Sequence, residues 1–560
     1  MTYSLYLAHI NDTHSHFEPS LVHFSQQINK QEVKFDAYCG GYAAIETAVT
    51  KQQQQAQKEN IPSLFLHAGD SFQGSLYFSR FKSRANEHLL NLLTPDAMTI
   101  GNHEFDLGNT PIAKFIEHVS FPVLAGNMDL SQEDQSKEAP LRPLKNLLRY
   151  DNEQGIAQYL IKPLANKQLA IVGITIDQMA KIGCPDPDCL FVNAIETTKA
   201  TVEHLKTQGI DHIIILSHLG HQGDIELAEQ VDDISLIVGG HSHTLSGDFS
   251  DIGIDSTGTA QQFVNQCLIL HAGKHAETIG LHKLSFDENG KVIEQQGGVQ
   301  FLLSAAWQEN TEQPPLDAQQ RAAIEDTVQN SPLFLHVNED QYINQVINSQ
   351  YRPAIAKMRS NIITELEAPL QHSRLPTPEL PQGSEIAPLV SAAFFHSASQ
   401  SMSIDFALHN AGGVRVSLKS GPLSEADICG RLLPFEIHIV SYDILGKDLR
   451  LALEGAIDNA TNNGIVGTGD GSYPYCHNLR FTYQSELPKG KRLSTLEIKR
   501  GNSWQDIENK KQYRGVSSAY TIAGKEGYDA ILNATNHIEH PISMSDSFMA
   551  FAQSNKITSS

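Results

Sequence analysis

Residues 98–106 read MTIGNHEFD, a short run that leads directly into Gly101, an amide, an imidazole and two carboxylates. A brief apolar run bounded by glycine is typical of a buried strand. The polar side chains of Asn102, His103, Glu104 and Asp106 are therefore predicted to stand just past a strand end, where the chain turns into a loop.

The same arrangement recurs along the first half of the chain. The runs are continuous rather than alternating, as expected of strands buried on both faces. Stretches with helical periodicity, 42–57 and 194–207, lie between them, so the pattern predicts an α/β domain. The runs are Leu5–Ile10, Leu64–His67, Met98–Ile100, Val123–Ala125, Leu169–Ile174, Ile213–Leu216 and Leu236–Val238.

Five of these runs end in metal-binding residue types. A single strand-end aspartate is often a cap, and a single histidine is often structural. Five such ends in order favour a site instead, and Asp, Asn and His together suit Zn, Mn or Co. Because parallel strands end at one edge of a sheet, we expect the residues to converge there and to hold two divalent ions. The ends read Asn11-Asp12-Thr13-His14, Gly69-Asp70, Gly101-Asn102-His103, Ser217-His218 and Gly239-Gly240-His241-Ser242-His243.

These blocks follow the order D-x-H, GD, GNH[ED], H and GHxH, which is the signature of the calcineurin-like metallophosphoesterases. The chain resembles that family at every block. The resemblance implies one metal on Asp12, His14, Asp70 and His243, and a second on Asp70, Asn102, His218 and His241. Asp70 would bridge the two ions.

Two metals and a bridging carboxylate suit phosphoryl chemistry, because they supply a hydroxide near neutral pH and neutralise the phosphoryl oxygens. By the same resemblance His103 is a catalytic residue rather than a ligand. Asp106, three residues on, would orient its imidazole toward the transition state or the leaving oxygen.

Further histidines lie close to these blocks. We interpret His9 and His67 as core strand residues, with hydrogen bonding to a metal ligand as the functional alternative. His16 and Glu18 either line the cleft or belong to a solvent-exposed loop. His221 gains no role from its spacing.

The chain length of 560 residues favours more than one domain. We predict a first domain over residues 1–330, closed by runs at 267–271 and 277–286 in an antiparallel portion. A linker at 331–360 contains a helix over 340–358, and a second α/β domain covers 361–550. That domain has a helical pattern at Ile386–Ser399 and strands at Phe406–His409, Ile437–Ile444, Leu479–Tyr483 and Leu493–Lys499.

The second half carries three blocks of its own: NAGGVR at 410–415, LPF at 433–435 and GKEGY at 524–528. They resemble the nucleotide-binding domain of the 5'-nucleotidases, within which bacterial NAD nucleotidase and UDP-sugar hydrolase/5'-nucleotidase look nearest. The fold implied is a metallophosphoesterase sandwich of mixed sheets flanked by helices, joined by the connector helix to an α/β nucleotide-binding domain, with the two domains rotating about that helix.

The resemblance also implies substrate contacts, which suit the residue types. Arg374 and Arg415 would grip phosphate, Asn410 would contact the nucleoside, and Glu526 would bind the ribose hydroxyls. Phe435 and Tyr520 would sandwich the base; without the resemblance both would be read as core aromatics.

Four positions depart from the family pattern. Glu436 and Ile437 replace the Gly and Asn of P-F-G-N, which leaves the base preference open. Leu370 stands where a second arginine is common, so phosphate binding is expected to be weaker or to use His372. Glu526 stands where Asp is usual.

Composition excludes several classes of protein. With 41 Lys and Arg against 64 Asp and Glu, the formal charge is -23, which disfavours binding to nucleic acid or to an anionic membrane. No stretch approaches the roughly 20 apolar residues that span a bilayer. The expected partner is a small nucleotide, and the oligomeric state is left open.

The N-terminus, MTYSLYLAHI, shows no signal-peptide pattern, so a cytoplasmic location is expected, with a periplasmic one as the family analogy. The six cysteines are expected to be reduced. Cys184 and Cys189 would pair only in an oxidising compartment.

The leading hypothesis is hydrolysis of nucleoside 5'-monophosphates to nucleoside and phosphate, in nucleotide catabolism or salvage. The enzymatic alternatives are a nucleotide pyrophosphatase acting on NAD or UDP-sugars and a 2',3'-cyclic-nucleotide phosphodiesterase. The non-enzymatic alternative is a nucleotide-binding protein, which an intact ligand set and dyad disfavour.

Overall fold

The computed structural model describes residues 2–259, 261–462 and 469–558. The chain divides into two compact units, Met1–Arg352 and Pro353–Ser560. The division falls in a continuous helical stretch made of α9 (Gln341–Val346), a single π turn (Ile347–Tyr351) and α10 (Arg352–Ser360).

The first unit is built from two stacked sheets. The larger has the order β19-β3-β18-β17-β1-β4-β5-β6-β8-β9, and the smaller has the order β10-β11-β13-β14-β16-β15. Strands β1, β4, β5, β6 and β8 run parallel, whereas β17 pairs antiparallel with β1, and β18 pairs antiparallel with β17. The strands in these two orders are β1 (Tyr3–Ile10), β3 (Gln31–Cys39), β4 (Ser63–His67), β5 (Ala97–Thr99), β6 (Val123–Ala125), β8 (Leu147–Asp151), β9 (Ile156–Ala157), β10 (Tyr159–Leu164), β11 (Lys167–Thr175), β13 (His212–His218), β14 (Leu236–Gly239), β15 (Gln262–Val264), β16 (Cys267–His271), β17 (Thr278–Phe286), β18 (Val292–Leu303) and β19 (Gln308–Glu309).

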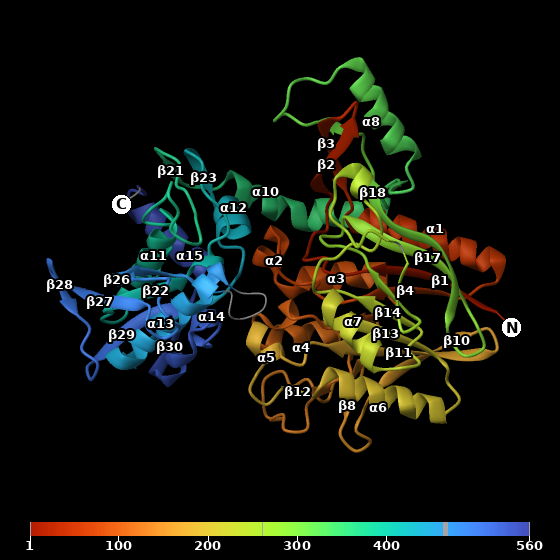
Figure 1. Cartoon of the computed structure of the whole chain (residues 1–560), viewed down its shortest axis with the longest axis horizontal. Helices are drawn as coiled ribbons and strands as arrows, with labels where there is room; N and C mark the ends of the chain where they lie inside the picture. The colour runs from red at the N-terminus through yellow and green to blue at the C-terminus, as the bar shows by residue number, and fades with distance from the viewer. Residues whose placement is uncertain (1, 260, 463–468, 559–560) are drawn as a thin grey trace. The chain divides into compact units, whose positions relative to one another are not determined.

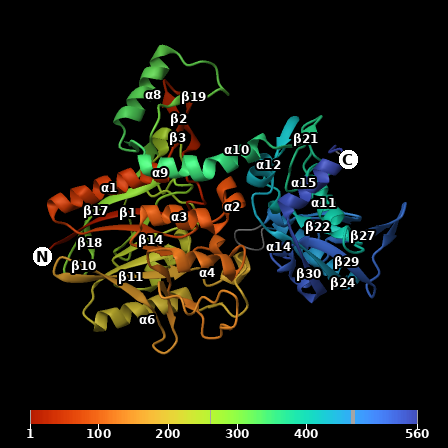
Figure 2. The ribbon, with the colours of Figure 1, turned by 180° about the vertical axis from the view of Figure 1, so that it is seen from behind.

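The core of this unit lies between the sheets. Leu5, Leu66, Leu216 and Val238 are among the side chains buried there. A second apolar layer packs α6 (Ala194–Thr207) and α7 (His221–Gln230) on the outer face of the smaller sheet. Figures 1 and 2 show α1 (Tyr42–Glu59) and α6 on opposite sides of the stacked strands. Strands covered on both sides are buried along their length, which explains their continuous apolar runs.

All seven predicted strands of the first half are strands in the structure, and the two predicted helices are α1 and α6. The hairpin of β2 (Ser20–Ile28) and β3 (Gln31–Cys39) was not predicted. The expected antiparallel closure holds for β17, but β16 lies parallel to β14 and only its other neighbour, β15 (Gln262–Val264), is antiparallel.

The second unit has a mixed sheet of order β25-β22-β29-β24-β30, with helices on both faces. Helices α11 and α15 pack on one face and α13 on the other. These elements are α11 (Ala387–Ser399), β22 (Phe406–Asn410), β24 (His438–Leu445), α13 (Gly446–Asn462), β25 (Pro474–His477), β29 (Gln512–Ser518), β30 (Thr535–Ser543) and α15 (Met544–Ser554). An antiparallel sheet of β26 (Leu479–Tyr483), β27 (Leu493–Arg500) and β28 (Ser503–Asp506) follows β25.

None of the six cysteines, all of which lie in the described residues, forms a disulfide, and this includes Cys184 and Cys189. Among the described residues, no helix combines the length and the apolar character that a membrane span requires.

The two sheets of the first unit approach each other closely where Gly173 of β11 meets Leu124 of β6. A Cβ at position 173 would lie 2.1 Å from the Leu124 Cβ, so Gly173→Ala must push the sheets apart. We expect a loss of about 1–3 kcal/mol in the free energy of unfolding of this unit, measured by urea denaturation. The control is Gly298→Ala in β18, where a Cβ meets nothing within 4 Å. Equal stability of the two variants would contradict this packing account.

Candidate functional site

Six of the seven predicted metal ligands lie in the loops that follow β1, β4, β5 and β14, and the seventh, His218, is the last residue of β13. Three of these strands belong to the larger sheet and two to the smaller one. The loops therefore converge because two sheets stack, and not because all five strands end at one edge of a single sheet as expected. All seven residues come together in the first unit.

The backbone at these ligands is unusual. Asp12, His14, Asp70, His241 and His243 all have left-handed φ angles, between 47° and 74°. A non-glycine residue in that region costs roughly 1 kcal/mol or more, and such strain concentrates at functional sites. The left-handed angles therefore mark these loops as a candidate functional site.

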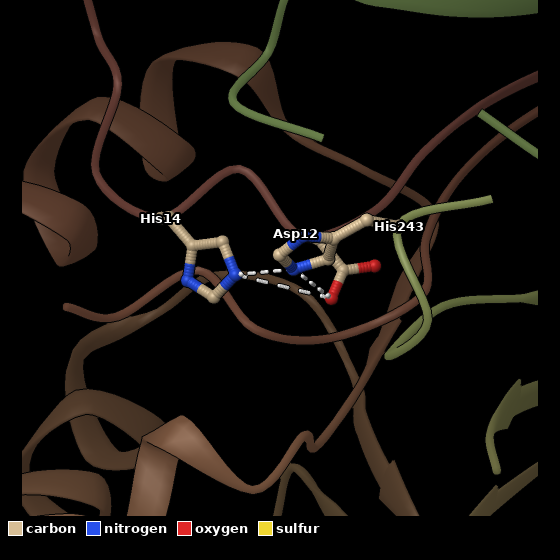
Figure 3. Close-up of side chains that lie close together, drawn as sticks. All are labelled: Asp12, His14 and His243. Atoms are coloured by element: carbon tan, nitrogen blue, oxygen red, sulfur yellow. Dashed lines mark hydrogen bonds and ion pairs between the residues drawn. The ribbon is translucent and has the colours of Figure 1, made fainter. Parts of the chain in front are cut away.

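Asp12, His14 and His243 form the first group (Figure 3). The two Nε2 atoms of His14 and His243 are 3.0 Å apart. The His243 Nε2 lies 3.6 Å from the Asp12 Oδ1, and the His14 Nε2 lies 4.0 Å from the same oxygen. Three potential ligand atoms thus face one another across a space that suits one cation.

Asp70, His218 and His241 form the second group. The His218 Nε2 is 3.1 Å from the Asp70 Oδ2, and the His241 Nδ1 is 2.8 Å from the Asn102 Oδ1. The backbone N–H of His241 donates to both oxygens of Asp12, at 3.1 and 2.9 Å, and so connects the two groups.

The histidines are prepared to act as ligands. His14 and His218 each place Nδ1 against a backbone carbonyl, Phe72 O at 3.1 Å and Ala68 O at 2.7 Å. Because a carbonyl only accepts, Nδ1 carries the proton and Nε2 presents its lone pair, the usual arrangement around a bound metal.

The electrostatics agree with this assignment. Burial holds the pKa of His14 far below its usual range, and burial together with neighbouring imidazoles lowers the pKa of His241 and of His243 to about 4. Burial also disfavours a charged His218, yet the Asp70 carboxylate raises the pKa of His218 to about 9. His14, His241 and His243 are thereby kept neutral, whereas His218, which Asp70 keeps protonated, would give up its Nε2 proton to a cation. Imidazoles and carboxylates in this arrangement fit a divalent cation.

Glu104 organises the loop that carries Asp70. Its buried carboxylate accepts hydrogen bonds from the backbone N–H groups of Gly101 at 2.7 Å, Asp70 at 3.0 Å, Ser71 at 2.7 Å and Phe72 at 3.1 Å. The Asp70 Oδ1 in turn accepts the backbone N–H of His103 at 2.9 Å. The sequence contained Glu104 within its block but gave no indication of this role.

Glycine is required beside these carboxylates. A Cβ on Gly101 would lie 2.1 Å from the Asp70 Oδ1, and one on Gly240 would lie 2.5 Å from the Ala68 carbonyl oxygen. Both positions therefore exclude any side chain.

The predicted dyad is present as a pair. The His103 Nδ1 lies 2.7 Å from the Asp106 Oδ2. Burial opposes the charged imidazole, but the carboxylates of Asp106 and Asp70 raise the pKa of His103 to about 10. A protonated imidazole oriented in this way can donate to a phosphoryl or leaving-group oxygen.

Two supporting residues were missed from sequence. Asn11 donates to the Asp12 Oδ2 at 2.6 Å and to the Gly273 carbonyl at 2.7 Å, so it fixes the Asp12 carboxylate. Asp224, on α7, accepts from Ser217 and from the His271 Nε2, and all three side chains are buried. Asp224 thereby joins the ends of β13 and β16 beside His218. Asn11 at least adjoins a ligand, whereas nothing in the sequence distinguishes Asp224.

The remaining histidines take several places. His9 and His67 are buried, with the His67 Nε2 3.2 Å from the Thr13 Oγ1. His16 is largely buried and stacks on His275 at 4.1 Å. The His221 backbone N–H donates to the Ser242 Oγ at 3.0 Å.

Glu18 belongs to neither metal group. Its carboxylate accepts from the Arg352 Nε at 2.8 Å and from the Tyr77 hydroxyl.

The second unit gathers several of the predicted substrate residues. The Asn410 Nδ2 donates to the Glu526 Oε2 at 3.0 Å, and Tyr520 also hydrogen-bonds to Glu526. The guanidinium of Arg415 lies over the Phe435 ring, 5.6 Å from its centroid. Burial and then Arg374 lower the pKa of Arg415, so two guanidinium groups share one region. Glu526 adopts a left-handed φ of 55°.

Leu370 has a structural explanation. Its side chain is buried in the core of the second unit, and its backbone pairs with Leu418 in an isolated bridge. His372, two residues further along the chain, has the side chain that we expected as the alternative phosphate contact. Burial, Arg374 and Arg415 lower the pKa of His372 to about 4.

Comparison with known proteins agrees with both units. Residues 5–245 match the calcineurin-like phosphoesterase family, and residues 368–533 match the 5'-nucleotidase C-terminal domain. A probable 5'-nucleotidase of Treponema pallidum is 27% identical, with 94% of this chain and 88% of that protein covered. The NAD 5'-nucleotidase of Haemophilus influenzae is also 27% identical, over 94% of this chain and 85% of that protein. The crystal structure of a 5'-nucleotidase precursor from Thermus thermophilus matches with a TM-score of 0.68 and 25% identity, over 99% of this chain and 97% of that one.

These findings define a hydrolase with a metallophosphoesterase unit and a nucleotidase C-terminal unit. The chain belongs to the 5'-nucleotidase family and is related to NAD nucleotidase and to UDP-sugar hydrolase-type enzymes.

Removing the Glu104 carboxylate should collapse the Asp70 loop. In Glu104→Ala the N–H groups of Gly101, Asp70, Ser71 and Phe72 lose their acceptor, and each buried unpaired group costs about 1–3 kcal/mol. We expect Glu104→Ala to lower the free energy of unfolding of the first unit by at least about 3 kcal/mol in urea. Glu117→Ala, at an exposed position of α4 (Asn109–His118), is the matched control. A Glu104→Ala protein as stable as this control would refute the role given to Glu104.

Proposed function

We propose that this protein hydrolyses nucleoside 5'-monophosphates to nucleoside and inorganic phosphate. The observation that carries the proposal is the pairing of two Asp/His groups with the His103–Asp106 dyad in one set of loops. A binding protein gains nothing from an imidazole oriented by a carboxylate beside two potential cation sites.

The metal groups fit two divalent ions, which we propose to be Zn, Mn or Co, with Asp70 as the bridging ligand. When bound, such ions supply a hydroxide near neutral pH and neutralise the phosphoryl oxygens. Asp12, His14, Asp70 and His243 would hold one ion, and Asp70, Asn102, His218 and His241 would hold the other. His103 would stabilise the charge that develops on phosphate and would protonate the leaving oxygen.

The second unit supports a nucleotide as the substrate. Arg374 and Arg415 match a phosphate group in charge and geometry. Asn410 and Glu526 already contact each other, and we assign them to the nucleoside, with Glu526 on the ribose hydroxyls. Phe435 and Tyr520 are proposed to sandwich the base.

Cleavage of NAD is the second candidate, because the NAD 5'-nucleotidase of Haemophilus influenzae is similar along nearly the whole chain. Phosphate release from AMP, and cleavage of NAD and UDP-glucose, should be measured with the protein loaded in turn with Zn, Mn and Co. We expect AMP to have the highest kcat/KM. Binding of AMP without hydrolysis of any of the three substrates would overturn the enzymatic proposal.

The dyad should govern turnover rather than binding. His103→Ala removes a proton donor worth about a 10²- to 10⁴-fold factor in rate, so kcat on AMP should fall by about that factor with KM changed only severalfold. His118→Ala, an exposed histidine on α4, serves as the control. Full turnover by the His103→Ala enzyme would remove the dyad from the mechanism.

A further inference from the structure

A loop in the second unit, residues 373–384, is closed by one phenol where its two ends meet. We call this place, at Ser373 and Ser384, the neck of the loop. The Tyr475 hydroxyl accepts a hydrogen bond from the Ser384 N–H at 2.7 Å and donates one to the Ser373 carbonyl, also at 2.7 Å. Tyr475 lies on β25 and is buried. Burial raises the pKa of Tyr475 to about 12, so the phenol stays protonated and keeps both bonds at neutral pH.

The neck is tightly fitted around this hydroxyl. Gly383 has a left-handed φ of 76°, and a Cβ there would lie 2.3 Å from the Tyr475 oxygen. Within the loop, Leu380 and Thr377 exchange backbone hydrogen bonds at 3.0 and 3.1 Å, and the Gly383 N–H donates to the Leu380 carbonyl at 2.8 Å. The loop is thus a preformed turn that Tyr475 fastens to the sheet.

Two basic side chains stand at this neck. Arg374 directly follows Ser373, and the His372 Nδ1 lies 2.9 Å from the Ser384 Oγ. The His372 Nε2 is buried, and the ring also interacts with the Val414 backbone. A buried ring nitrogen next to two guanidinium groups is suited to an anion that brings its own hydrogen-bonding atoms.

The contact that Arg374 makes with Asp470, 3.0 Å from Nη1 to Oδ1, does not fix its position. Both side chains are nearly half exposed, and exposed ion pairs contribute little. The hydrogen bonds at the neck therefore fix the backbone from which the Arg374 side chain extends. A fixed backbone reduces the conformational entropy that is lost when Arg374 binds an anion.

We propose that Tyr475, acting through Ser373 and Ser384, is the positioning residue that sets Arg374 and His372 for the phosphate of the substrate. The inference rests on the proposed function, because it deepens the phosphate contact assigned to Arg374. Tyr475 itself would not contact the substrate.

The test is Tyr475→Phe, which removes only the hydroxyl, with Tyr483→Phe on β26 as a matched control from the same aromatic cluster. Loss of one well-placed hydrogen bond to phosphate corresponds to about a tenfold change in binding, so KM for AMP should rise about tenfold with kcat within about twofold. The kcat for bis(p-nitrophenyl) phosphate, which depends on the metal groups, should stay unchanged.

A second measurement does not depend on turnover. Tryptic cleavage after Arg374, followed by peptide mass mapping of the full chain, should be faster in Tyr475→Phe than in the wild type and in Tyr483→Phe. Unchanged cleavage, or faster cleavage with an unchanged KM for AMP, would each overturn the proposal. If instead Arg374→Ala leaves the KM for AMP unaltered, the phosphate contact in the proposed function fails, whatever Tyr475→Phe does to the loop.

Discussion

The hydrogen bonds between the Glu104 carboxylate and the backbone of the Asp70 loop are the interaction on which the site depends. Four backbone N–H groups converge on one buried carboxylate, which fixes the loop after β4 against the loop after β5. Asp70 is thereby held beside His218 with a left-handed backbone. Without Glu104 the strain at Asp70 would have no compensation, and the carboxylate assigned to both ions would be free to move.

The stacking of the two sheets positions the other predicted ligands. Asp12, Asp70 and Asn102 follow strands of the larger sheet. In the smaller sheet His218 ends β13, and His241 and His243 follow β14. The contact of Gly173 with Leu124 sets the spacing of the two layers. Ligands that start from rigid strands can be placed with the precision that metal binding and phosphoryl transfer require. The chain is strongly acidic overall, so in the proposed function a phosphate would be attracted by local groups, namely Arg374, Arg415 and the two proposed cations.

The sequence predicted much of this, because short apolar runs and the residues after them are local features. The seven strands, the fold class, the family and the blocks around Asp12, Asp70 and His103 could all be read directly. The hairpin at 20–39 was missed since its polar strands lack a continuous apolar run.

The supporting contacts were missed for another reason. Glu104 acts on backbone groups up to 34 residues away, and Asp224 meets His271, 47 residues on. Such pairings depend on how the loops fold back, as do the left-handed φ angles at the ligands, and no periodicity in the sequence encodes them. Tyr475 is a similar case, since only the folded chain brings it to both ends of the loop at 373–384.

The central claim is that the Asp and His groups of the first unit bind two ions that share Asp70. Metal content per chain after loading with Zn and gel filtration tests it most directly, compared among the wild type, His243→Ala and Asp70→Ala. The account predicts two equivalents in the wild type, about one in His243→Ala and none or nearly none in Asp70→Ala, because only Asp70 serves both sites. One equivalent in the wild type, or two retained by Asp70→Ala, would contradict it.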